Sequence, residues 1–183
     1  MPETTEVPPA APTASPGSLW QACLHESAHL IGASVLLKRA ARAMVFGDGS
    51  GVAAVGGGVP ASFKEAMVAA AGICGDMLGL LYTPPKGVSA TPADVADPDT
   101  SQRVHAAMGA IMSDRVALAR WAILDHESKP LTWVARHEWV LSSAQEFVLE
   151  HRHEILETAT DLFTRGIVNL PAEPAGKDQD HVD

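Results

Sequence analysis

Two histidines one helical turn apart, His25 and His29, are the residues whose type and spacing point most directly to chemistry. On an α-helix, residues i and i+4 project from the same face, so the two imidazoles can bind one divalent metal ion. Glu26 follows His25 directly, so its carboxylate would lie beside that metal without being a ligand. A carboxylate in that position can accept a proton from a water molecule on the metal, as in H-E-x-x-H zinc peptidases. The run therefore predicts a zinc site with Glu26 as the general base.

The motif requires a helix, and the surrounding sequence predicts one. Ser18, with Gln21 three residues later, fits a capping box and predicts that the helix begins there. Apolar residues then recur at helical spacing through the motif, at Leu24, Ala28, Ile31, Val35 and Leu36. The alternative interpretation is a pair of ordinary solvated or core histidines that happen to be one turn apart.

A catalytic zinc ion usually has three protein ligands and keeps a fourth position for water, so one ligand must come from elsewhere in the chain. The histidines and acids of residues 137–138 and 150–154 lie on strongly charged helix faces and are interpreted as solvated surface. Better candidates are the acids that follow two elements able to fold back onto the histidine helix: Asp76, Asp94, Asp97 and Asp99.

Two of these aspartates have alternative roles. Asp76 lies in an apolar helix, where a carboxylate is costly unless it binds the metal or hydrogen-bonds to a ligand histidine. Asp99, with Gln102 three residues later, resembles a capping box, so its ordinary role would be an N-cap. The residues alone leave the choice of the third ligand open.

The elements between these residues predict a mainly α fold, a zincin-like helical domain with a small β-hairpin or short sheet near the H-E-x-x-H helix. Residues 42–46 and 51–55 flank a glycine-rich turn and predict the hairpin. Ser62 and Glu65 form a capping box that predicts the start of an apolar core helix. From Arg103 the pattern is helical nearly to Gly166, with breaks near Ser113 and at residues 128–130.

Length and composition fit a single domain with frayed ends. The 183 residues are 46% hydrophobic, with a mean hydropathy of +0.07. Residues 1–17 and the acidic tail 171–183 have the composition of disordered segments, which leaves 18–170 as the metallopeptidase-like domain.

Charge and hydropathy restrict the partners. The net charge of -9 and the pI of about 5.3 argue against nucleic acid and anionic lipid. No run of 18 apolar residues and no secretory signal occurs, so neither membrane insertion nor export is expected. Cys23 and Cys74 are too few for a disulfide framework, which agrees with a reducing compartment and a cytoplasmic location.

The order of these features resembles the peptidase domain of FtsH-like AAA zinc proteases over about residues 18 to 170. In that family an Asp that begins a helix, with Gln three positions on and Ala eight positions on, supplies the third zinc ligand. Asp99, Gln102 and Ala107 match this pattern. The resemblance therefore implies that the metal ligands are His25, His29 and Asp99.

The chain departs from the family in two motifs. Ser27-Ala28 replaces the usual Ala-Gly between the histidines, and residues 72–76 lack the Arg of the family's Gly-Arg-x-Ala-Glu-Glu run. No Walker A motif is present, and there is no room for an ATPase domain. The late segment 144–157 is similar to the helix that precedes the family's final short helix.

The resemblance implies a zinc-dependent peptidase that hydrolyses peptide bonds of flexible or unfolded polypeptides. Its substrate is expected to bind in extended form along the edge strand 51–55, and the further partner is left open between a homo-oligomer and a separate ATPase chain. The alternative from another class is a noncatalytic pseudo-peptidase that acts as an interaction or regulatory module. A third alternative is a helical protein that binds no metal.

Overall fold

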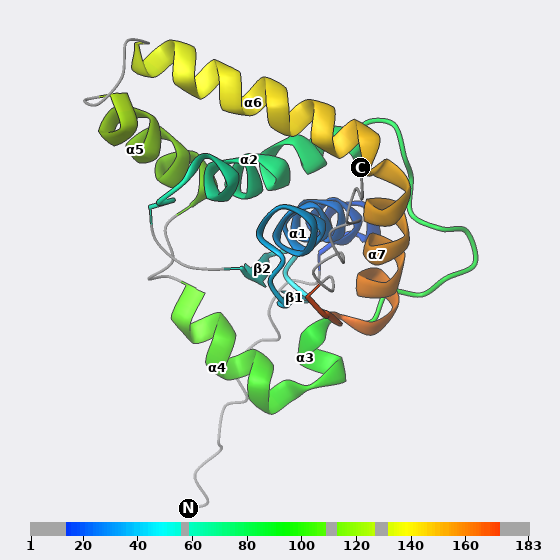
Figure 1. The fold of residues 1–183 in the computed structure, drawn as a ribbon. Helices are drawn as coiled ribbons and strands as arrows, with labels where there is room; N and C mark the ends of the chain where they lie inside the picture. The colour runs from blue at the N-terminus through cyan, green and yellow to red at the C-terminus, as the bar shows by residue number, and fades with distance from the viewer. Residues whose placement is uncertain (1–13, 56–58, 109–112, 127–131, 173–183) are drawn as a thin grey trace, which may run out of the picture.

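The fold is mainly helical with one small sheet (Figure 1). The computed structural model describes residues 14–55, 59–108, 113–126 and 132–172. In chain order the elements are α1 (Pro16–Leu37), β1 (Ala41–Val45), β2 (Gly51–Ala54), α2 (Phe63–Leu78), α3 (Ala93–Ala96), α4 (Pro98–Met108), α5 (Asp114–His126), α6 (Trp133–Glu150), α7 (Arg152–Arg165) and β3 (Ile167–Leu170). This confirms the predicted fold class.

Helix α1 lies in the centre of the molecule, between α2, α7 and the sheet (Figure 1). Its N-cap is Ser15, whose hydroxyl oxygen accepts a hydrogen bond from the Ser18 amide at 3.2 Å, and Pro16 occupies the first turn. The predicted start at Ser18 is therefore wrong by one turn, because Pro has no amide hydrogen and suits a first turn that needs none. Most side chains from Leu19 to Ala33 are buried, so this helix is the core of the domain.

The sheet has the strand order β2-β1-β3 and is antiparallel throughout. The predicted hairpin is confirmed, because β1 pairs with β2 and Arg42 lies opposite Ala54. The sequence did not predict β3, which pairs with the other edge of β1 and brings Leu170 opposite Ala41. Strand β2 thus has one edge that no strand of the described chain covers.

Helix α2 packs closely along α1. The predicted cap is confirmed, because the Ser62 hydroxyl accepts from the Glu65 amide at 3.2 Å and Glu65 Oε2 accepts from the Ala61 amide at 2.8 Å. Close contact of the helices depends on Gly75, where a Cβ atom would lie 2.9 Å from the Ala28 Cβ. Helices α5 and α6 lie on the outer side of α2 (Figure 1).

The later helices begin and end largely as the sequence predicted. The break near Ser113 is confirmed, since α4 ends at Met108 and α5 begins at Asp114. Gly166 ends α7 with a φ of 71°, the left-handed conformation that glycine adopts without strain. The expected long final helix is instead divided at His151 into α6 and α7.

The predicted ends of the domain lie largely beyond the described chain. The break at 128–130 and most of the two segments expected to be disordered fall outside the described residues, although residues 16 and 17 belong to α1. Among the described residues, no helix has the length and apolar character needed to cross a membrane.

Candidate metal centre

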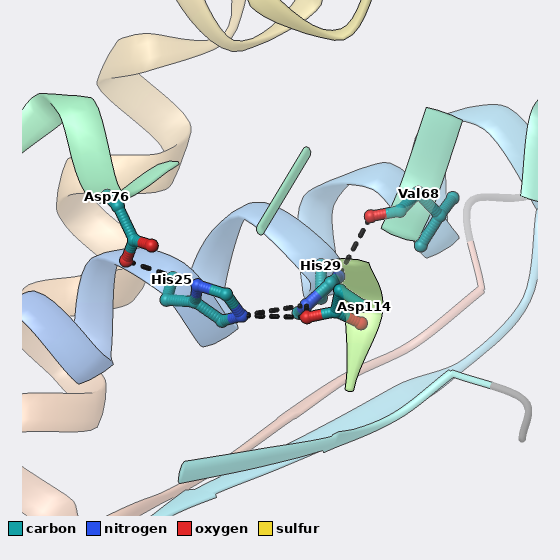
Figure 2. Close-up of polar contacts among 5 residues, drawn as sticks. All are labelled: His25, His29, Val68, Asp76 and Asp114. Carbon is teal, nitrogen blue, oxygen red and sulfur yellow. Dashed lines mark hydrogen bonds and ion pairs between the residues drawn. The ribbon is translucent and has the colours of Figure 1, made fainter. Parts of the chain in front are cut away.

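Three side chains converge between α1 and the start of α5 (Figure 2). The Oδ2 atom of Asp114 lies 3.0 Å from Nε2 of His25 and 3.0 Å from Nε2 of His29. The two Nε2 atoms are 3.2 Å apart, because the histidines are one turn apart on α1. Two imidazole nitrogens and one carboxylate oxygen form a donor set that fits a catalytic zinc ion, which leaves a further position for water.

Both imidazoles are held by their second ring nitrogen. His29 Nδ1 lies 2.8 Å from the carbonyl oxygen of Val68, so this nitrogen carries the hydrogen and Nε2 keeps its lone pair for a metal. His25 Nδ1 lies 3.1 Å from Oδ1 of Asp76, on the side of the ring opposite Asp114 (Figure 2). Helix α2 therefore orients both histidines of α1.

The structure does not bring the expected third ligand, Asp99, to the histidine pair. Asp99 is exposed in the first turn of α4, where its carbonyl oxygen accepts from Nε of Arg103 at 3.1 Å. Its alternative role as N-cap also falls to another residue, since Oδ1 of Asp97 accepts from the Thr100 amide at 3.2 Å. Asp114 is the residue that joins the two histidines in a group that could hold a metal ion.

A sequence signal for Asp114 existed and was missed. Like Asp99, Asp114 begins a helix, and Ala122 lies eight positions after it. The pattern fails only three positions on, where Ala117 stands in place of the expected Gln. Asp76 takes one of its two predicted alternatives, the hydrogen bond to a ligand histidine, and Asp94 binds the Gly47 amide at the hairpin turn.

Glu26 lies beside the cluster, buried between α1 and β2. Only 6% of the residue is exposed, and its side chain packs against Gly51, where a Cβ atom would come within 2.7 Å of Glu26 Cγ and Oε1. Burial raises the pKa of the Glu26 carboxyl, and the neighbouring His29 and His25 oppose that rise. A carboxyl with a raised pKa accepts and returns a proton more readily near neutral pH.

The pKa values of His25 and Asp114 are shifted in opposite directions. Burial alone would lower the pKa of His25, but hydrogen bonds to Asp114 and Asp76 outweigh it and raise the pKa to about 10. Burial would also raise the pKa of Asp114, whereas its hydrogen bonds to His25 and His29 hold that pKa well below its usual range. Without a metal, a proton therefore takes the place of the cation between these side chains.

A cleft of about 450 Å³ opens onto the cluster. Its floor contains the motif residues of α1, one side is the edge strand β2, and the other is the first half of α2. The cleft is also lined by apolar side chains, namely Leu37, Val52, Val55, Val59, Val68 and Met108. The cleft also holds an ion pair, since Nη1 of Arg39 lies 3.2 Å from Oε1 of Glu65.

Comparisons with protein-family models, curated proteins and solved structures found no match.

Proposed function

We propose that the protein is a zinc-dependent peptidase that hydrolyses peptide bonds of flexible or unfolded polypeptides, similar to the peptidase domain of FtsH-like proteases. The observation that carries this proposal is the convergence of His25, His29 and Asp114 beside a buried Glu26 at the floor of a cleft. A noncatalytic module would have no chemical use for Glu26, whose burial is costly.

Each residue has a defined role in the proposed reaction. A zinc ion held by the three ligands would polarise the peptide carbonyl and lower the pKa of water to about 7. Glu26 accepts the proton of the attacking water and returns it to the leaving amine. Asp76 and the Val68 carbonyl keep Nε2 of each histidine directed at the same point.

The β2 edge that no described strand covers supports an extended polypeptide as the substrate. Residues Gly51 to Ala53 line the cleft, and an extended peptide can pair with the main chain of such an edge. Main-chain pairing requires an extended backbone, which flexible segments present and folded domains do not. A separate ATPase chain or a homo-oligomer is the proposed partner where a folded substrate must first be opened.

The test combines metal analysis with a substitution of the base. Purified wild-type protein is expected to carry about one zinc ion per chain, because three ligands converge on one point. Glu26→Gln should keep the zinc ion but lose hydrolysis of casein, assayed without ATP, by about 10²- to 10⁴-fold.

A His25→Ala, His29→Ala double variant is the matched control for metal content. Negligible zinc in both folded proteins would reject the metal site. Zinc-loaded wild type that cleaves no unfolded polypeptide would instead favour the noncatalytic interaction module.

A further inference from the structure

The cleft contains a charged pair that the proposed peptide hydrolysis does not use. Arg39 and Glu65 line the same cavity as His25 and His29, together with several apolar side chains. Among the described residues that line this cleft, Arg39 is the only lysine or arginine. A guanidinium group in a cleft can bind a carboxylate through two parallel hydrogen bonds.

Glu65 fixes the position of Arg39. Its Oε1 atom accepts a hydrogen bond from Nη1 of Arg39, while its Oε2 atom accepts a hydrogen bond from the Ala61 amide just before α2. The described contact occupies Nη1, and a guanidinium group has five hydrogen-bond donors. The Arg39 side chain is 57% exposed, so its other donors can meet a ligand.

The separation from the metal site fits a short stretch of peptide. Leu37, two residues before Arg39, lies eight positions after His29 on α1, which is about 12 Å at about 1.5 Å per residue. An extended peptide covers roughly 3.3 Å per residue, so this distance corresponds to about three or four residues. The apolar residues between the two ends would contact the side chains of that stretch.

We propose that Arg39 is a specificity-determining residue that binds a carboxylate of the substrate, about three or four residues from the peptide bond held at the histidine pair. The carboxylate is that of the chain terminus or of an acidic side chain. This inference rests on the proposed peptidase function for its substrate, but it concerns binding and is tested by binding.

The test uses zinc-loaded Glu26→Gln protein, so that the peptide is bound without being cleaved. Isothermal titration calorimetry compares acetyl-Ala-Val-Ala-Val-Leu with a free C-terminus, the same peptide as its amide, and an amide with Glu in place of Leu. A free terminus or the Glu side chain should bind about ten-fold more tightly than the plain amide. The preferred peptide of the two identifies the source of the carboxylate.

Arg39→Gln should abolish this preference, and Arg39→Lys should restore part of it because the charge returns without the bidentate geometry. Arg165→Gln is the matched control, since Arg165 of α7 is also a surface arginine paired with a carboxylate, Asp161, and does not line the cleft. Equal binding of the three peptides, binding of none of them, or a preference that survives Arg39→Gln would overturn the proposal.

Hydrolysis by the wild-type protein separates the two proposals. If Arg39 selects carboxylates but no peptide is cleaved, the peptidase function fails and the carboxylate site stands. If peptides are cleaved with the same KM whether free or amidated, the peptidase function stands and the carboxylate site fails.

Discussion

The imidazole ring of His29 lies directly against Gly72 of α2, where a Cβ atom would overlap the ring. The neighbouring Val68 carbonyl, one turn earlier, accepts the hydrogen of the same ring. The absence of a side chain at position 72 is therefore a condition for placing Nε2 of His29 beside His25 and Asp114.

Gly72→Ala should displace His29 and weaken zinc binding by about 10- to 100-fold, the effect of losing a contact that orients a ligand histidine. Competition with a chromogenic chelator measures the affinity. Gly17→Ala is the control, because a Cβ atom at this position of α1 would meet its nearest neighbour, Ser15 Oγ, at an ordinary 3.8 Å. An unchanged affinity in Gly72→Ala would contradict the proposed role of the contact.

Gly51→Ala should disturb the proposed base, Glu26, while leaving the metal ligands in place. A Cβ atom on β2 would press on the Glu26 side chain but touch neither histidine among its nearest neighbours. We expect zinc content close to that of wild type and a loss of casein hydrolysis approaching the 10²- to 10⁴-fold expected for Glu26→Gln. Loss of zinc together with activity would show that the substitution disturbs the whole site rather than the carboxylate.

Three aspartate substitutions should affect zinc binding in a fixed order. Asp114→Ala removes a proposed ligand oxygen and should nearly abolish zinc binding. Asp76→Asn weakens the hydrogen bond to His25 and should lower the zinc affinity by about 10- to 100-fold. Asp99→Ala should leave the affinity unchanged, because this side chain is exposed on α4. A large loss in Asp99→Ala with none in Asp114→Ala would reverse the ligand assignment.

The metal-free protein should have a stability maximum in mildly acidic solution. The pKa of His25 rises from 6.5 to about 10 on folding, so its stabilisation is complete below pH 6.5 and is lost as the pH rises toward 10. The pKa of Asp114 is lowered from 3.8, so its stabilisation is present above that pH and is lost below it. The raised pKa of Glu26 acts in the same direction as His25, because the buried carboxyl loses stability as the pH rises above 4.5 and it ionises.

Urea unfolding in the presence of a chelator, repeated from pH 3 to pH 10, measures this profile. His25→Gln should flatten the alkaline side, and a profile unaffected by that substitution would exclude the cluster as its source. Zinc replaces the bound proton, so zinc affinity in the wild type should increase with pH through the same range.

The sequence predicted the part of the site that one helix supplies. His25, Glu26 and His29 have positions relative to one another that follow from the helical repeat alone, and the structure keeps them together. The third ligand depends on where a helix far along the chain packs, which local patterns do not specify. Two aspartates begin helices in that region, and the one with the fuller sequence match, Asp99, is exposed on α4 and does not join the histidine pair.

The difference between local signals and long-range packing also explains which parts of the fold the sequence predicted. Caps and turns were predicted where their signal is local, as at Ser62 and Gly166. Strand β3 was missed because its only strong signal is its partner, β1, more than a hundred residues earlier. The start of α1 was misplaced because Ser15-Pro16 and Ser18 both make acceptable first turns, and the structure uses the earlier one.

The pairing of β3 with β1 makes the order of synthesis matter. The histidine motif and the hairpin leave the ribosome early, whereas the strand that completes the sheet leaves it after α7. Contacts between such distant segments form slowly, because a long loop must close before they stabilise anything. During translation, therefore, the β1 edge that pairs with β3 stays unpaired until the last strand has been made. Under the proposed peptidase function, a growing chain would gain its complete fold, and with it any activity, only after its last strand has been made.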